Sequence, residues 1–158
     1  MTHQDDSFQW TTPCKQAFER LKAELISTPT LQLPNPDLPY TVTTDVSNIA
    51  VGAVLSQPDN HGRLHPIAFE SRKLSDAEKN YPVHEKEMLG IVNALKIWRV
   101  YLLGNHFQVV TDHASLKFLH TQPNLSTRQA RWMEMLADYD FDITYLPGKT
   151  NIVADALS

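Results

Sequence analysis

The sequence has little cysteine, no long apolar run and only a small net charge. Its single cysteine, Cys14, excludes an internal disulfide framework and a cysteine-based zinc site, and favours a reducing compartment. No apolar segment is long enough to cross a bilayer, and no signal-peptide pattern is present, so we expect no membrane partner. The formal net charge of −4 argues against a strongly basic nucleic-acid binder acting alone. It does not exclude a nuclease, because acidic catalytic residues themselves lower the net charge.

The chain of 158 residues is 42% hydrophobic and 20% charged, which is typical of a globular domain with a buried core. Residues 13–26 place apolar side chains at helical spacing and predict an amphipathic helix. The stretch "STPTLQLPNPDLPY" that follows has four prolines in fourteen residues, which favours an extended connector. We therefore predict a boundary near residues 30–38, with a tail and linker over 1–36 and the main domain over 37–158.

Alternating and β-branched residues predict five strands, and apolar periodicity predicts the helices between them. The expected strands cover residues 41–48, 51–57, 65–73, 106–113 and 141–149, and the expected helices cover 82–103, 114–120 and 127–139. The ending "NIVADALS" reads as the first turns of a last helix that is truncated at Ser158. The order predicts an α/β fold: a five-stranded mixed sheet, three antiparallel strands then two more, with helices packed on it.

Four of the acidic residues stand among apolar neighbours or at the ends of predicted strands: Asp45, Glu87, Asp112 and Asp155. On a helical projection, Glu87 shares the core-facing arc of its helix, whereas Glu85 falls about 160° away and mostly towards solvent. Asp112 follows the strand "FQVV", at the sheet edge where α/β folds form their sites.

Each carboxylate also has a purely structural interpretation. A strand-end aspartate is often a turn or cap residue, and Glu87 could pair with Lys86 or Arg99. Four such residues together favour a shared site, because gathered carboxylates repel one another unless a divalent cation screens them. Oxygen ligands suit Mg²⁺ or Mn²⁺, and two ions about 4 Å apart would activate water for phosphodiester hydrolysis.

Longer segments carry a specific resemblance: "TTDVSNIAVGAVLSQ", "HPIAFESRKLSDAEKNYPVHEKEMLGIVNALKIWRVYLLG", "FQVVTDHASLKFL" and "RQARWMEMLADYDFDITYLPGKTNIVADALS". In this order they resemble the ribonuclease H domain of reverse transcriptases from gypsy-type LTR retrotransposons. The similarity extends over about residues 8–158. It implies a ribonuclease H-like fold, and "FQWTTPCKQAFERLKAELISTPTLQLPNPDLPY" looks like the end of the preceding polymerase connection.

The resemblance implies an endonuclease that cleaves the RNA strand of an RNA–DNA hybrid with two Mg²⁺ ions, for which Mn²⁺ would substitute. In that family pattern Asp45 would bridge both ions, Glu87 and Asp112 would hold one, and Asp155 would hold the other. Glu85 is a rival for the place of Glu87. The loop histidine of many ribonucleases H is missing from "LPGKTN", so His113 or Lys149 would serve product release, or that aid is absent.

Hybrid recognition needs donors for phosphates and for the 2′-hydroxyl of RNA. Candidates with such groups are Arg72, Lys73, Asn80, His84, His113, Arg128 and Arg131. For each one singly, a solvated surface side chain is an equally good interpretation. The small net charge predicts weak, salt-sensitive binding by the domain alone, with the polymerase domain of the same polyprotein holding the duplex.

The implied setting is intracellular, in cytoplasmic virus-like particles or the nucleus, and no small-molecule substrate is expected. A polymerase active-site motif of the form "YxDD" is absent from the sequence, so we predict no DNA synthesis. Two alternatives stay open. One is a catalytically silent or host-adopted module that binds nucleic acid, and the other is a structural support for the polymerase.

Overall fold

The computed structural model describes residues 11–27, 31–113, 125–146 and 157. The chain divides into two compact units, Met1–Thr30 and Leu31–Ser158. The described part of the first unit is helix α1 (Thr12–Ser27), as its apolar periodicity predicts. Within the described ranges, no helix has the length and apolar character needed to cross a membrane.

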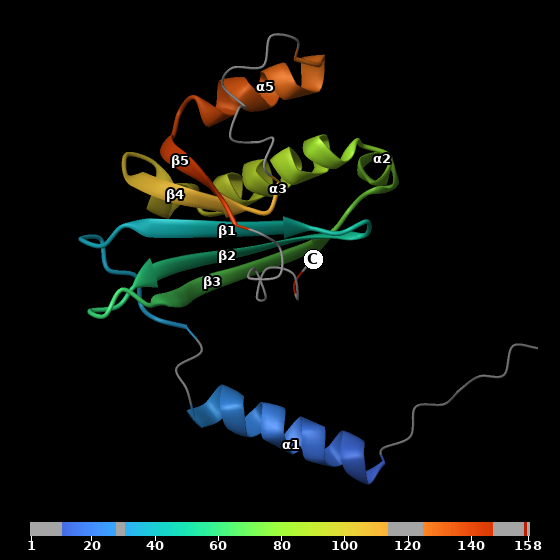
Figure 1. The fold of residues 1–158 in the computed structure, drawn as a ribbon, viewed down its shortest axis with the longest axis vertical. Helices are drawn as coiled ribbons and strands as arrows, with labels where there is room; N and C mark the ends of the chain where they lie inside the picture. Colours follow the sequence, from blue (N-terminus) through green and yellow to red (C-terminus); the bar gives the residue numbers. More distant parts are fainter. Residues whose placement is uncertain (1–10, 28–30, 114–124, 147–156, 158) are drawn as a thin grey trace, which may run out of the picture. The chain divides into compact units, whose positions relative to one another are not determined.

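The second unit is built on a five-stranded sheet in the order β3-β2-β1-β4-β5 (Figure 1). Its strands are β1 (Tyr40–Val46), β2 (Ala50–Pro58), β3 (Leu64–Lys73), β4 (His106–Thr111) and β5 (Asp140–Tyr145). The first three strands pair antiparallel, and β4 runs parallel to both β1 and β5. The predicted mixed sheet of three antiparallel strands and two more is confirmed.

Four helices accompany this sheet in the described part of the second unit: α2 (Asp76–Lys79), α3 (Val83–Ile97), α4 (Arg99–Leu102) and α5 (Thr127–Leu136). The predicted unbroken helix over 82–103 is wrong, because the backbone leaves helical geometry at Trp98. Trp98, at this break, and Leu102, after it, are both buried in the core, where they are 4% and 0% exposed. The predicted helix over 114–120 lies outside the described residues.

Helix α3 packs against β1 and β2, and α5 lies alongside α3 (Figure 1). The close approach of α3 to the sheet depends on Gly90. A Cβ atom at Gly90 would lie 2.8 Å from Val46 Cγ2 and 3.5 Å from Val51 Cγ1. Because real Cβ contacts are longer than the first of these distances, Gly90 allows the helix to lie nearer the strands than any other residue type would.

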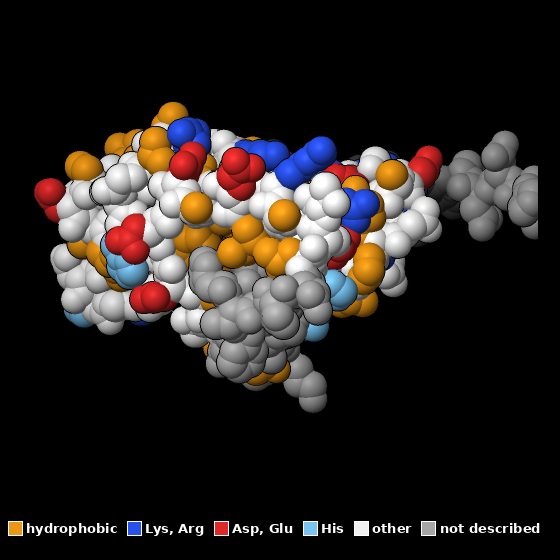
Figure 2. Space-filling model, turned by 90° about the horizontal axis from the view of Figure 1, so that it is seen from above, with side chains coloured by type: hydrophobic (Ala, Val, Ile, Leu, Met, Phe, Trp, Pro, Cys, Tyr) orange, Lys and Arg blue, Asp and Glu red, His pale blue; other side chains and the backbone are white. Residues whose placement is uncertain are grey.

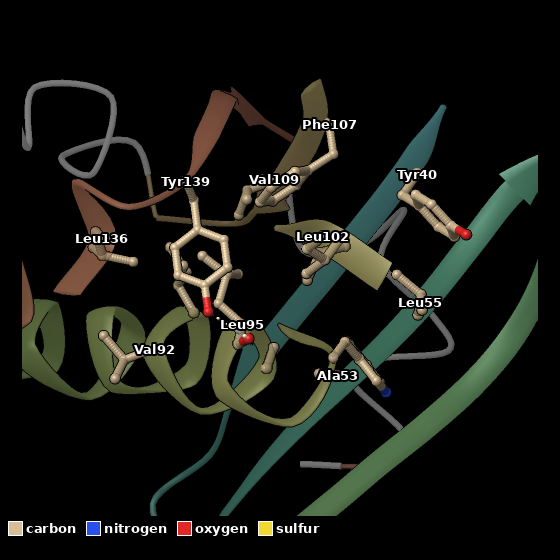
Figure 3. Packing of buried hydrophobic residues seen from close by; sticks show 14 of the residues in the cluster. Tyr40, Ala53, Leu55, Val92, Leu95, Leu102, Phe107, Val109, Leu136 and Tyr139 are labelled. Atoms are coloured by element: carbon tan, nitrogen blue, oxygen red, sulfur yellow. Dashed lines mark hydrogen bonds between the residues drawn. The ribbon is translucent and has the colours of Figure 1, made fainter. Parts of the chain in front are cut away.

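A continuous apolar core fills the space between the sheet and these helices (Figure 3). Leu55 of β2, Leu95 of α3 and Phe107 of β4 are almost fully buried in it. Each such side chain contributes about 1.5–3 kcal/mol to folding. Tyr139 reaches from the turn before β5 to α3, and its hydroxyl donates a hydrogen bond of 3.1 Å to the Leu95 carbonyl. The core therefore fixes α3 and the parallel strands in one rigid arrangement.

Candidate active site

Two of the predicted carboxylates lie where the parallel strands β1 and β4 stop pairing. The last register partners of the two strands are Thr43 and Val110. Asp45 is two residues beyond Thr43, and Asp112 is two residues beyond Val110. Because parallel strands present their carboxyl ends at the same edge, this termination brings Asp45 and Asp112 to one place.

Asp45 is held firmly on its other side, where β1 continues to pair with β2. Its register partner is Gly52, which in turn pairs with Ser71 of β3. The Asp45 residue is only 8% exposed. At the end of this row, the Ser71 hydroxyl donates a hydrogen bond of 2.6 Å to the carbonyl of Leu157. The fourth predicted carboxylate, Asp155, lies outside the described residues.

Glu87 faces these two aspartates from the beginning of α3. It is 5% exposed, and its Oε2 atom has no hydrogen-bond partner within the described part of the chain. Burial, together with the negative charges of Asp112 and Asp45, raises the pKa of Glu87 to about 8. The predicted inward position of Glu87 is confirmed, and its carboxyl group is electrostatically coupled to both strand-end aspartates.

The alternative in which Glu87 pairs with a neighbouring cation does not hold. The Lys86 ammonium instead donates to Asn48 Oδ1 over 3.5 Å, and the Arg99 guanidinium lies 3.7 Å from an Asp138 oxygen. Among the described residues, Glu87 is therefore a buried carboxyl group near two others and without a positively charged partner.

The chemistry of this donor set fits a divalent cation. Oxygen-only ligands suit Mg²⁺ and Mn²⁺, and the Oε2 atom of Glu87, which no described protein group satisfies, is available as such a ligand. Across the described ranges, however, no three acidic, histidine or cysteine side chains form a group arranged to hold a metal ion. Metal binding by Asp45, Glu87, Asp112 and Asp155 therefore stays a prediction.

Glu85 does not point to solvent, and that prediction was wrong. The residue is 6% exposed, because α5 covers the side of α3 that faces away from the sheet. The Ser126 hydroxyl donates a hydrogen bond of 3.0 Å to Glu85 Oε1, and the Arg128 guanidinium pairs with Glu85 Oε2. Glu85 is thus a buried ion-pair partner of α5.

Two of the predicted substrate contacts, Arg72 and Arg128, line the same groove of about 280 Å³. Both guanidinium groups already bind carboxylates of the protein. Arg72 donates through two nitrogens to the Glu78 carboxylate, each over 2.9 Å, and Arg128 pairs with Glu85. The pairing with Arg72 and the hydrogen bond from the Ser75 backbone N–H lower the pKa of Glu78 to about 2. These arginines are engaged in holding the fold.

The other predicted contacts are distributed over the surface. Asn80 ends α2, where its side-chain amide donates to the Asp76 carbonyl over 2.9 Å. Lys73, Arg131, His84 and His113 are exposed or half-buried, and Lys149 lies outside the described residues. Figure 2 shows basic side chains interspersed with acidic ones on one face of the molecule. The role of these residues in substrate binding stays a prediction.

Some residues that shape the site were missed by the sequence analysis. Ser126 and Gln129 form a capping box at the start of α5, and Ser75 and Glu78 form another at α2. The pattern of serine followed three residues later by glutamate or glutamine is a readable signal for both helix starts. No such signal marks Gly90, whose importance depends on side chains of two strands that are distant in sequence.

Comparison with known proteins gives consistent matches. A family model described as "RNase H-like domain found in reverse transcriptase" matches residues 35–139. The chain is 49% identical over 143 residues to the retrovirus-related Pol polyprotein from transposon 297 of Drosophila melanogaster, covering 90% of this chain and 13% of that protein. It therefore spans only a small part of this curated relative.

Solved structures show the same fold at lower identity. The foamy viral protease-reverse transcriptase in complex with an RNA/DNA hybrid has a TM-score of 0.57 and 22% identity, covering 87% of this chain and 19% of that one. LC11-RNase H1 in complex with an RNA/DNA hybrid has a TM-score of 0.58 and 13% identity, covering 75% of this chain and 92% of that one. The expected ribonuclease H-like fold is confirmed.

Proposed function

Because the chain belongs to the family of RNase H-like domains found in reverse transcriptases, we propose that it hydrolyses the RNA strand of RNA–DNA hybrids during reverse transcription of a retrotransposon. The observation that carries this proposal is the coupling of Glu87 to Asp45 and Asp112. A buried, unpaired carboxyl group beside two more costs stability, and a functional site is the usual reason for keeping such a group.

In this proposal Asp45, Glu87, Asp112 and Asp155 hold two Mg²⁺ ions. The bound cations would neutralise the gathered carboxylates and act as Lewis acids on the phosphodiester. Asp45 contributes a carboxylate whose position is fixed by pairing with Gly52, and Asp112 contributes one from the end of β4. Glu87 supplies its unpartnered oxygen from α3. His113, directly after Asp112 in the sequence, or Lys149 would assist product release, unless that aid is absent.

The proposed substrate is an RNA–DNA hybrid, and the proposed partner is the polymerase domain of the same polyprotein. Two similar proteins of known structure are described in complex with RNA/DNA hybrids, and one of them is a protease-reverse transcriptase. Residues 1–36 would be the end of the polymerase connection. Interspersed surface charge supports a domain that relies on the polymerase to hold the duplex (Figure 2). Virus-like particles in the cytoplasm, or the nucleus, are the proposed location.

Cleavage of a hybrid labelled on its RNA strand tests this function. We expect Mg²⁺- and Mn²⁺-dependent cleavage by the parent chain and at least about a 100-fold lower rate for Asp45→Asn. Asp142→Asn is the matched control, because Asp142 is an exposed strand aspartate that contacts His106 of the adjacent strand. A folded parent that leaves the hybrid intact with both ions, or equal rates for parent and Asp45→Asn, would contradict the proposal.

A nucleic-acid-binding module without catalysis is the second candidate. It is favoured by the absence, in the described ranges, of three carboxylates arranged to hold an ion. This alternative predicts that the parent chain binds the hybrid and never cleaves it, and that Asp45→Asn leaves the affinity unchanged. The same labelled hybrid, followed by both gel shift and cleavage, separates the two candidates.

A further inference from the structure

Helix α3, which carries Glu87, begins without a side-chain cap of its own. Its N-cap residue is Pro82, which makes no side-chain capping hydrogen bond. The Pro82 carbonyl accepts hydrogen bonds of 3.0 Å from the backbone N–H groups of Glu85 and Lys86. A helix start without a side-chain cap is less stable by about 1 kcal/mol than a capped one and frays more easily. Another part of the molecule must therefore hold this turn in place.

Helix α5 supplies the missing restraint. Ser126, the N-cap of α5, accepts a hydrogen bond from the Gln129 N–H through its side-chain oxygen. The same hydroxyl donates its own proton to Glu85 Oε1 over 3.0 Å. One side chain thus caps α5 and fastens the first turn of α3 to it, so the two helix starts are joined directly.

Arg128 adds a second restraint on the same turn. Its guanidinium group pairs with Glu85 Oε2, and its central carbon lies 3.6 Å from the centre of the Tyr81 ring. Tyr81 directly precedes Pro82, so Arg128 contacts the chain both before α3 and inside its first turn. We refer to Tyr81, Glu85, Ser126 and Arg128 as the α3 clamp.

Burial gives the α3 clamp its strength. The Glu85 side chain is 8% exposed, whereas that of Arg128 is 42% exposed. A carboxylate taken out of water is costly unless it is paired and hydrogen-bonded, so Glu85 keeps its position only while Ser126 and Arg128 remain in contact. Charge-assisted hydrogen bonds are stronger and more directional than neutral ones, which fixes the rotation of the first turn.

The α3 clamp and the carboxylate site lie on opposite sides of one helical turn. Glu85 precedes Glu87 by two residues, and successive residues of a helix are about 100° apart, so the two side chains point in different directions. Gly90 holds the next turn against Val46 of β1. Fixing Glu85 against α5 therefore fixes the direction in which Glu87 projects towards Asp45 and Asp112.

We infer that Glu85 is a positioning residue for the reaction, acting through the α3 clamp to hold Glu87 at the carboxylate site. The inference rests on the proposed hydrolysis of RNA–DNA hybrids for its kinetic consequence. Its structural consequence, a fixed first turn of α3, can be measured independently of any activity.

The test compares Glu85→Gln and Arg128→Ala with the parent chain in hybrid cleavage at saturating Mg²⁺. We expect kcat to fall about tenfold in each variant, while KM changes less than about twofold, because misplacing a catalytic group lowers the rate more than the affinity. Methylguanidinium should restore a measurable part of kcat in Arg128→Ala but none in Arg128→Ala combined with Glu85→Gln. A role limited to overall stability would give no such selective rescue.

Asp59→Asn is the matched destabilised control. Asp59 accepts hydrogen bonds from the backbone N–H groups of His61 and Arg63 and pairs with the Arg63 side chain over 2.9 Å, in the turn between β2 and β3. This variant loses an ion pair at a more exposed turn, outside the α3 clamp. We expect it to keep the kcat of the parent below its unfolding temperature. An equal loss of kcat in Asp59→Asn would overturn the inference.

Hydrogen exchange separates failure of the inference from failure of the proposed function. In Glu85→Gln, the amides of residues 85–89 should exchange at least about tenfold faster than in the parent, with unchanged exchange in β1 and β4. If the parent cleaves hybrids but this exchange and kcat are both unchanged, the inference is wrong and the function stands. If the parent cleaves nothing, the function fails, and unchanged exchange would then also remove the α3 clamp as a restraint.

Discussion

At the scale of single residues, the central feature is a carboxyl group kept in unfavourable surroundings. Glu87 is buried, has an oxygen without a hydrogen-bond partner in the part of the chain that the structure describes, and lies near two other carboxylates. In the absence of bound cations, its ionised form opposes folding. Natural proteins keep such costly groups mainly where they serve binding or catalysis. A substitution that removes the charge should therefore raise stability and lower activity.

This reasoning predicts that Glu87→Gln stabilises the metal-free domain in a pH-dependent way. The pKa is about 8 in the folded chain against an ordinary 4.5, so the stability contributed by this group is complete below pH 4.5 and is lost as the pH rises through 8. Glutamine resembles the protonated form. At pH 8.5 the variant should unfold roughly 5–10 °C above the parent, with no difference below pH 4.5.

Thermal unfolding followed by circular dichroism in the presence of a chelator checks this prediction. Added Mn²⁺ should raise the Tm of the parent and have a smaller effect on the variant. A variant that is less stable than the parent at pH 8.5 without metal would show that the Glu87 carboxylate has a stabilising partner.

The inward position of Glu87 could be predicted from the sequence, whereas the burial of Glu85 could not, and the reason is physical. A helical projection correctly puts Glu87 and Ile91 on the same inward-facing side of the helix, because the angle between two residues of a helix follows from local geometry. Burial of Glu85 requires a second helix that begins about forty residues later, at Ser126. Apolar periodicity carries no information about such a long-range polar contact.

At the scale of secondary-structure elements, the distance between α3 and the sheet decides where Glu87 lies. Gly90 sets that distance, because its missing Cβ leaves room for Val46 of β1. Strand positions were predicted well from alternation and β-branched residues, whereas the break at Trp98 was not. The apolar pattern of the helix continues through Trp98 and Leu102, so the sequence carries no signal for the break.

Gly90→Ala should therefore destabilise the domain although alanine is the better helix former. The helix propensity gain is roughly 1 kcal/mol, but the new Cβ would lie 2.8 Å from Val46 Cγ2, and overpacking of this kind costs about 1–3 kcal/mol. We expect a lower urea midpoint and a reduced cleavage rate. Lys96→Ala, an exposed substitution on α3, is the control and should change stability by less than about 0.5 kcal/mol. A higher midpoint for Gly90→Ala would show that α3 can move away from the sheet at little cost.

At the scale of the whole molecule, the question is where positive charge is available, and on the face seen in Figure 2 basic side chains alternate with acidic ones. The net charge is −4, and the two arginines best placed for a groove are already paired with Glu78 and Glu85. These two guanidinium groups are therefore not free to neutralise phosphates. Composition alone predicted weak binding of the hybrid. Only the structure identifies which arginines are already paired, because pairing depends on contacts between distant segments.

Binding of a hybrid by the isolated domain should consequently be weak and salt-sensitive, through a small number of phosphate contacts. Two or three phosphate contacts predict a slope of about −2 to −3 in a plot of log Kobs against log salt concentration. Arg131→Ala should reduce the steepness by about 1, and Arg63→Ala, at the turn between β2 and β3, should leave it unchanged. Fluorescence anisotropy with Ca²⁺ in place of Mg²⁺ would give these values. A slope steeper than about −5 would require a basic surface that Figure 2 does not show on this face.

The ending of the β1–β4 ladder at Thr43 and Val110 gives the two strand-end aspartates unequal freedom. Asp45 is still tied to β2 through its pairing with Gly52, whereas Asp112 lies one residue past the last partner that β4 shares with β5, Thr111. Asp112 lies beyond the register of both neighbouring strands and is therefore less constrained than Asp45. If Mg²⁺ or Mn²⁺ binds as proposed, Asp45 would be the fixed ligand and Asp112 the one that adjusts to the radius of the ion.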